Sequence, residues 1–180
     1  MRKNWAALAL TGMLCLTTFA GTQTVSAETA DSAKQVDIVF THDTHSHLNT
    51  FTTIVDEAEK EVGGFARINT LIQEQKAKNP DTLVIDGGDF SMGTLIQTVF
   101  ETQAAEIRML GYMGCDVTTL GNHEFDYRSK GLANMLNSAT ESGDDLPALV
   151  VCNVDWDSME QAGLSDGQQQ IQSAFETYGV

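Results

Sequence analysis

The segment Thr118 to Asp126, which reads Thr-Thr-Leu-Gly-Asn-His-Glu-Phe-Asp, ends an apolar strand pattern and places an amide, an imidazole and two carboxylates within five residues. Asn122 offers a neutral amide oxygen to a hard cation, and His123 precedes Asp126 by three residues, a spacing at which a helical turn brings both side chains together. Asn, His and Asp are also common where a strand gives way to a helix, because they cap helices and turns. The segment alone therefore fits a capping cluster as well as a catalytic one.

An apolar strand followed by a polar loop also occurs at two earlier positions in the chain. Residues 36–40 predict a first strand that runs into Asp43-Thr44-His45, and residues 82–85 predict a second strand that runs into Gly88-Asp89. A further strand is predicted within residues 146–154. Between these strands, apolar residues at helical spacing predict three helices, from about residue 63 to 78, 95 to 113 and 128 to 138.

This alternation of strands and helices predicts an α/β domain with a largely parallel sheet and right-handed crossovers. The carboxyl ends of parallel strands lie at one edge of the sheet, where such folds bind their ligands. We therefore expect Asp43 and His45 to lie near Asp89 and near Asn122 and His123, although Asp43 or Asp89 taken alone is better explained as a cap or a turn.

Length and composition indicate a single globular domain with a hydrophobic core, since the 180 residues are 42% hydrophobic and 19% charged. The formal net charge is -15, from 25 acidic and 10 basic residues. Such a charge argues against a nucleic acid polymer or an anionic membrane as the main partner. Cations are the more natural ligands.

The amino terminus has the pattern of a secretory signal peptide. Arg2 and Lys3 precede an apolar run over residues 5–20, and Val25-Ser26-Ala27 offers a cleavage site of small residues. The run is shorter than the roughly 20 residues that span a bilayer, so we expect no stable membrane span in the mature chain. The protein is predicted to be exported, to the cell surface, the periplasm or the medium. The predicted organisation is a signal peptide, a linker and a partial domain: residues 1–27, 28–35 and 36–180.

Two cysteines would remain in the mature chain, because Cys15 lies in the signal peptide. Cys115 and Cys152 permit one disulfide in an oxidising compartment, and their spacing does not resemble a zinc-thiolate site. We expect both to be buried as small apolar residues instead. For Cys152 the reason is the apolar run over residues 148–152, which has the composition of a strand covered on both faces.

Three polar loops in this order, D-x-H, G-D and G-N-H-E, resemble the signature of the calcineurin-like metallophosphoesterases. The match of residues 43–48, 63–67 and 121–126 is similar to the secreted 5'-nucleotidase and UDP-sugar hydrolase branch of that family. The resemblance covers about residues 36–154. It implies the amino-terminal half of an α/β/β/α sandwich with mostly parallel strands.

By the same resemblance, the site would hold two divalent metal ions, with Zn, Mn, Co, Mg and Ca as candidates. Asp43 and His45 would bind the first ion, Asp89 would bridge both ions, and Asn122 would bind the second. The implied substrate is a nucleotide or a nucleotide sugar, and the implied reaction is hydrolysis of its phosphate ester by activated water.

His123 and Asp126 would form the catalytic dyad. The resemblance implies that His123 binds no metal, stabilises charge on the phosphate and assists the leaving oxygen. Asp126 would orient the imidazole and favour its protonated form.

Four polar neighbours of these residues are expected to have supporting roles. His42 and His47 are assigned to the surroundings of the site or to the surface. Glu124 is expected to support the loop or to cap the following helix rather than to bind metal. Arg67 is expected to pair with an acid rather than with phosphate.

The chain departs from the family pattern by what it lacks. The family completes its site with downstream histidines in G-H and G-H-x-H motifs, whereas all four histidines here lie at or before residue 123. We therefore expect an amino-terminal part of a longer protein, inactive by itself and with one apolar sheet face uncovered. Two alternatives stay open: a non-catalytic exported binding module, and a cyclic-nucleotide phosphodiesterase of the same fold. The oligomeric state does not follow from the sequence.

Overall fold

Four short parallel strands form the central sheet, and their spatial order is their order in the sequence. In the computed structural model the described residues are 36–180, so the predicted signal peptide and linker lie outside them. The sheet has the order β1-β4-β5-β6. Its strands are β1 (Ile38–Thr41), β4 (Leu83–Asp86), β5 (Val117–Thr118) and β6 (Ala148–Leu149). The α/β class with parallel strands is confirmed.

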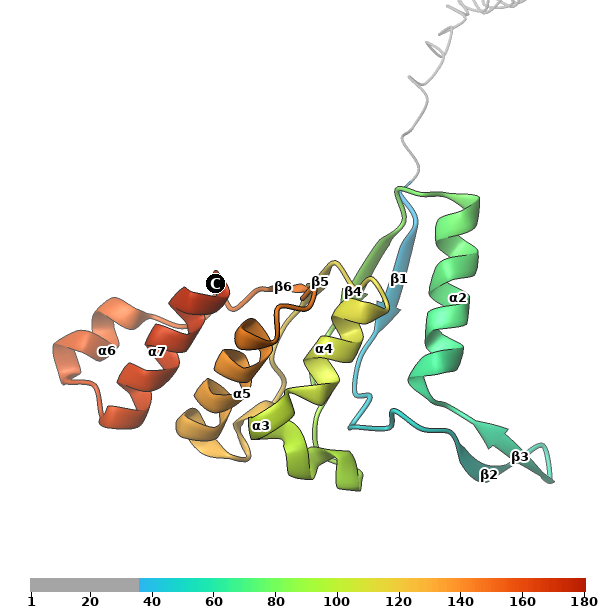
Figure 1. Cartoon of the computed structure of the whole chain (residues 1–180), viewed down its shortest axis with the longest axis horizontal. Coiled ribbons are helices and arrows are strands. Elements are labelled where there is room, and N and C mark those ends of the chain that lie inside the picture. Colours follow the sequence, from blue (N-terminus) through green and yellow to red (C-terminus); the bar gives the residue numbers. More distant parts are fainter. Residues whose placement is uncertain (1–35) are drawn as a thin grey trace, which may run out of the picture. The chain divides into compact units, whose positions relative to one another are not determined.

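Helices connect the strands and follow one another along the sheet in Figure 1. Right-handed crossovers between strands that advance steadily in one direction put every connecting helix on the same face. The helices are α2 (Phe65–Lys78), η1 (Leu95–Val99), α3 (Phe100–Gln103), α4 (Ala105–Tyr112), η2 (His123–Phe125), α5 (Arg128–Ser142), α6 (Trp156–Ala162) and α7 (Asp166–Tyr178).

Strand residues alternate between the helix-covered face and an open face, as the period of a strand requires. On the covered face, Val84 and Leu149 are 1% and 5% exposed. The opposite face is apolar and open, as the sequence led us to expect. Its exposed members include Ile38, Phe40, Leu83 and Val150.

Asp86, at the end of β4, ties β1, β4 and β5 together. Its carboxylate accepts hydrogen bonds from the Thr41 hydroxyl of β1 at 2.8 Å and from the Thr118 hydroxyl of β5 at 3.0 Å. It also accepts one from the Gly88 amide at 3.0 Å. Burial raises the pKa of the Asp86 carboxyl. These bonds fix the carboxyl ends of β1, β4 and β5 relative to one another.

Several element boundaries differ from the sequence prediction. The predicted helix over residues 95–113 is broken at Ala104, which is buried and has a left-handed backbone with φ 47°. The predicted strand over residues 146–154 is shorter in the structure, where β6 comprises only Ala148 and Leu149. Helices α6 and α7 were not predicted. Helix α7 packs on α5 through Ile171, Ala174 and Phe175, which its amphipathic spacing presents to one side.

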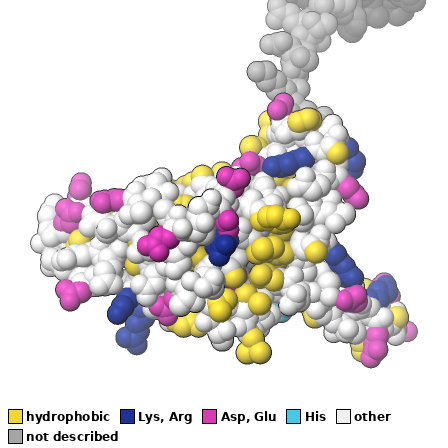
Figure 2. Space-filling view, in the orientation of Figure 1, with side chains coloured by type: hydrophobic (Ala, Val, Ile, Leu, Met, Phe, Trp, Pro, Cys, Tyr) yellow, Lys and Arg dark blue, Asp and Glu magenta, His cyan; other side chains and the backbone are white. Residues whose placement is uncertain are grey.

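A hairpin precedes α2, in a stretch for which no strand or helix was predicted. Strands β2 (Phe51–Val55) and β3 (Ala58–Val62) pair antiparallel around a two-residue turn at Asp56 and Glu57, both with positive φ. That conformation matches the twist of paired strands, but it is usually supplied by Asn or Gly. Figure 2 shows acidic side chains on the hairpin and over α6 and α7, and hydrophobic side chains gathered between α2 and α4.

The two described cysteines are both free. Cys115 is buried, as predicted, and its burial raises the pKa of the thiol to about 12. The prediction for Cys152 was wrong, because this residue is exposed. Its run is covered on one face only, and Val150 already lies on the open side. No helix among residues 36–180 is long and apolar enough to cross a membrane.

Candidate metal centre

The loop after β1 presents Asp43 and His45 through an unusual backbone. Asp43, His45 and Ser46 all have left-handed φ values, of 52°, 45° and 54°. Such a conformation costs a residue other than glycine roughly 1–2 kcal/mol, so neighbouring contacts must hold it. They come from the loop after β4: the amides of these three residues donate to the carbonyls of Gly88, Asp89 and Phe90 at 3.0, 3.1 and 2.8 Å.

Two glycines let the loop after β4 approach the loop after β5. Gly88 has φ +86°, and a Cβ there would lie 2.6 Å from the Gly121 amide nitrogen. At Gly121 a Cβ would meet the Asp89 carboxylate. The close approach of the two loops therefore requires glycine at positions 88 and 121. Asp89 itself is left-handed, with φ 53°.

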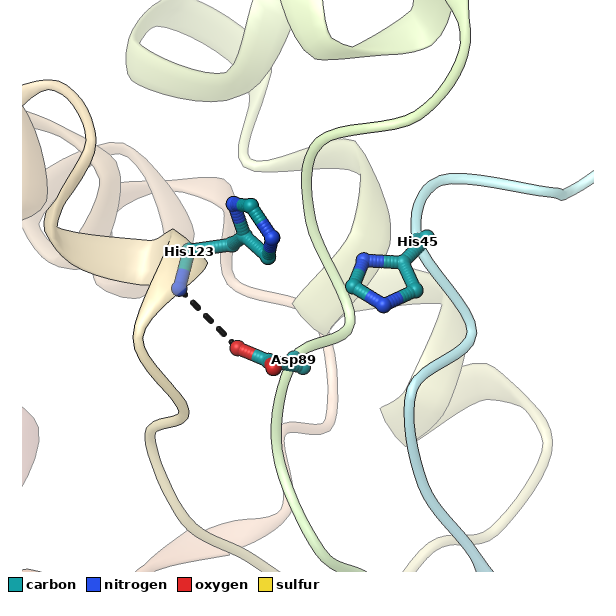
Figure 3. A group of neighbouring side chains, drawn as sticks. All are labelled: His45, Asp89 and His123. Carbon is teal, nitrogen blue, oxygen red and sulfur yellow. Dashed lines mark hydrogen bonds between the residues drawn. The ribbon is translucent and has the colours of Figure 1, made fainter.

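His45, Asp89 and His123 gather from the three strand ends, as Figure 3 shows. Each offers one ligand atom, and these atoms all lie within 4.8 Å of one another. The Asp43 carboxylate lies 3.5 Å from the Nε2 atom of His45. Imidazole nitrogens with carboxylate oxygens suit Zn, Mn or Co, so the donor set fits a divalent transition metal.

Asn122 and His123 both lie against Asp89. The His123 backbone amide donates to Asp89 Oδ1 at 2.9 Å. With the Asn122 amide oriented so that its nitrogen faces the acid, that nitrogen donates to Asp89 Oδ2 at 3.1 Å. The imidazole rings of His45 and His123 meet edge to face, with centroids 5.1 Å apart. The four predicted metal ligands, Asp43, His45, Asp89 and Asn122, therefore lie next to one another, and His123 lies beside them.

The two residues of the predicted dyad are in direct contact. His123 Nδ1 and Asp126 Oδ2 are 2.7 Å apart. His123 begins the single turn of η2, and Asp126 directly follows that turn. The hydrogen bond to Asp126 raises the pKa of His123. At the other end of the site, His42 Nδ1 lies 2.5 Å from Asp43 Oδ2, and this hydrogen bond lowers the pKa of Asp43.

Glu124 is fully buried and joins the two loops of the site. One carboxylate oxygen accepts from the amides of Asp89 and Gly121, at 3.0 and 2.7 Å. The other accepts from the amide and hydroxyl of Ser91, at 3.0 and 2.7 Å. This geometry confirms the expected support of the loop. Its span, from Gly121 back to Ser91, could not be read from the sequence.

Two other neighbours behave as expected. Arg67 pairs with Glu61, with 3.2 Å between the guanidinium and carboxylate atoms. His47 lies beside the site, with its ring centroid 5.3 Å from that of Phe51. A cavity of about 310 Å³ opens there, next to Asp43 and His45. This cavity could not be predicted from the sequence, because the hairpin that carries Phe51 was missed.

The fold and the site together define a metallophosphoesterase type of domain. Residues 36–174 match the calcineurin-like phosphoesterase family, and the chain belongs to this family.

The names of similar proteins are more specific than the description of the family. The chain is 34% identical to a probable 5'-nucleotidase of Treponema pallidum over 57% of this chain and 18% of that protein. It is 32% identical to a 5'-nucleotidase-related protein of Glossina morsitans morsitans over 80% of this chain and 26% of that one. Among solved structures, a 5'-nucleotidase precursor from Thermus thermophilus is 31% identical with a TM-score of 0.58, covering 67% of this chain and 22% of that one.

A second solved structure, the NAD nucleotidase of Haemophilus influenzae, is 30% identical with a TM-score of 0.52, covering 57% of this chain and 19% of that one. The chain thus spans only between 18% and 26% of the length of these relatives.

Proposed function

We propose that this chain carries metal ligands and the catalytic dyad of an exported, metal-dependent phosphoric ester hydrolase that acts on nucleotides or nucleotide sugars. The observation that carries the proposal is the meeting of three strand-end loops, in which ligand atoms of His45, Asp89 and His123 lie within 4.8 Å of one another. Family membership and the 5'-nucleotidase relatives support the same chemistry.

In this proposal Asp43 and His45 hold one divalent ion, Asp89 bridges to a second, and Asn122 binds that second ion. When bound, such ions neutralise phosphate charge and lower the pKa of a coordinated water. The number and identity of the ions are part of the proposal. Backbone hydrogen bonds between the two loops hold Asp43, His45 and Asp89 relative to one another, which reduces the cost of assembling the site.

His123 is assigned to the substrate rather than to metal. Its Nδ1 atom is engaged by Asp126, which leaves Nε2 to face the phosphate. The same hydrogen bond favours the protonated imidazole, which can stabilise negative charge on the phosphate oxygens and give a proton to the leaving oxygen. Because its ligand atom lies near those of His45 and Asp89, the geometry alone also permits His123 as a ligand.

Export is proposed from the sequence of residues 1–27, and with it an extracellular, cell-surface or periplasmic location. Its test is the amino-terminal sequence of the protein recovered outside the cytoplasm, which should begin at residue 28. A retained Met1 in the exported protein would contradict the signal peptide.

Two variants test the assignment of roles, in the protein expressed from its complete reading frame. Hydrolysis of AMP and of a UDP-sugar is measured with added Mn²⁺, and bound metal is measured by equilibrium dialysis. Asp89→Asn should lose both metal and activity, because it removes the bridging carboxylate. His123→Ala should keep the metal and lose about 10²–10⁴-fold in rate, the usual contribution of a general acid.

The outcomes separate the alternatives. Loss of metal in His123→Ala would show that His123 is a ligand and that its assigned role is wrong. Nucleotide binding without hydrolysis by the unaltered protein would favour the binding module. Turnover of a cyclic nucleotide in preference to AMP would favour the phosphodiesterase. For the 180-residue chain by itself we expect little turnover with Mn²⁺, and robust hydrolysis of AMP would contradict that expectation.

A further inference from the structure

Glu106 is a buried acid that none of the proposed chemistry uses. It lies in the first turn of α4 and is 0% exposed. Its Oε1 atom accepts a hydrogen bond from the Ser46 hydroxyl at 2.7 Å, and among the described residues its Oε2 atom has no partner. Burial raises the pKa of this carboxyl, and the charge of Glu124 raises it further. Burying a carboxyl with an unpartnered oxygen costs free energy, and the Oε1 atom of the same carboxyl binds Ser46.

Ser46 is the last of the left-handed residues in the loop after β1, and it directly follows His45. It is 0% exposed, and each of its polar groups is engaged. Its amide donates to the Phe90 carbonyl at 2.8 Å, and its carbonyl accepts from the Thr94 hydroxyl at 2.7 Å. Its hydroxyl donates to Glu106, so the amide, the carbonyl and the hydroxyl of Ser46 are all hydrogen-bonded. The contact joins residues that are 60 apart in the sequence.

The break between α3 and α4 sets the position of Glu106. Ala104 ends α3 and begins α4 with φ 47°, two residues before Glu106. A continuous helix through this position would turn residue 106 to another direction. The left-handed residue therefore aims the carboxyl at Ser46.

We propose that Ser46 and Glu106 are positioning residues of the candidate metal centre: Glu106 fixes the Ser46 hydroxyl, and Ser46 fixes the left-handed turn that presents Asp43 and His45. This inference rests on the proposed metal centre. Without the anchor, the strained residues of the turn would relax toward ordinary backbone conformations, and the ligand atoms would lose their shared orientation.

Cobalt titration of the protein expressed from its complete reading frame, followed by the visible absorption of bound Co²⁺, tests the inference. Ser46→Ala removes the hydroxyl and should weaken Co²⁺ binding about 10-fold, the lower end of what loss of a supporting contact costs a metal site. Glu106→Gln keeps an oxygen that accepts from Ser46 and should stay within about 3-fold of the unaltered chain. Glu106→Leu removes the acceptor and should match Ser46→Ala.

A control separates positioning from general loss of stability. Ser138→Ala also removes one hydroxyl hydrogen bond, to the Glu101 carbonyl at 2.8 Å, in a part of the fold that contributes nothing to the metal centre. It should lower the midpoint of urea unfolding and leave Co²⁺ affinity unchanged. The double variant Ser46→Ala with Glu106→Leu should bind Co²⁺ no more weakly than Ser46→Ala alone, because Glu106 acts through Ser46.

Two results would overturn the inference while the metal centre stands. One is Ser46→Ala with the Co²⁺ affinity of the unaltered chain, and the other is Glu106→Gln as weak as Ser46→Ala. Should Glu106→Leu not fold, Ser46→Ala and Glu106→Gln still decide the matter. Absence of Co²⁺ binding in the unaltered protein from the complete reading frame would instead overturn the metal centre itself, and the inference with it.

Discussion

Replacing Glu124 by Gln is the sharpest test of how the two loops of the site are held together. The substitution keeps the shape of the side chain and replaces one carboxylate oxygen by an amide group. In the structure those two oxygens accept four hydrogen bonds, from the Asp89, Gly121 and Ser91 amides and from the Ser91 hydroxyl. Because Glu124 is 0% exposed, water cannot replace a bond that is lost.

The loss in the free energy of unfolding depends on the orientation that the amide group of the new glutamine side chain would adopt. Turning the amide nitrogen toward Ser91 is the cheaper choice, since the Ser91 hydroxyl can rotate and accept from it. The Ser91 amide is then left without an acceptor, at roughly 1–3 kcal/mol, and the bonds from Asp89 and Gly121 lose a charged acceptor, at about 1 kcal/mol each. We therefore expect a loss of about 3–5 kcal/mol in the free energy of unfolding, a large part of a typical domain stability.

Urea unfolding of the 180-residue chain, followed by circular dichroism, measures this loss. The matched control is Glu176→Gln, the same change at an exposed position of α7, which should alter stability by no more than about 0.5 kcal/mol. A loss below about 1 kcal/mol in Glu124→Gln would refute the reasoning. It would mean that the loops after β4 and β5 keep their approach without the carboxylate.

Two further predictions concern titratable groups. In metal-free protein, Asp126→Asn should lower the pKa of His123 toward its ordinary value, because the hydrogen bond to Asp126 is the main cause that raises it; NMR titration of the imidazole protons measures this, and an unchanged pKa would contradict the dyad. At about pH 8, iodoacetamide should modify exposed Cys152 at least 10-fold faster than buried Cys115, whose pKa is about 12. Peptide mapping distinguishes the two, and equal modification in folded protein would contradict the burial of Cys115.

The strand-end positions of the site could be predicted because they depend on local pattern. The apolar runs before Asp43, Asp89 and Asn122 are strands β1, β4 and β5, and parallel strands in a right-handed α/β fold have to end at one edge. The contact of His123 with Asp126 depends only on a spacing of three residues within one turn. Such features can be predicted without knowing which distant residues they contact.

Other features depend on partners far away in the sequence. The hairpin was missed because Asp56 and Glu57 take a conformation that their neighbours, not their own propensities, stabilise. The helix break at Ala104 was missed for the same reason, since alanine favours an uninterrupted helix. Cys152 was placed on a doubly covered strand, because an apolar run cannot reveal that only one face of its sheet is packed.

The sequence alone determined which residues could meet at the sheet edge and what chemistry they could support. The reason is that the positions of the strands and the short-range spacing of polar residues can be recognised from the pattern of the chain. Only the tertiary structure decided which hydrogen bonds hold these residues together. Glu124 reaches back to Ser91, and Glu106 reaches Ser46 across 60 residues. Hydrogen bonds of buried groups depend on three-dimensional packing, and packing brings together residues whose separation along the chain carries no local signal.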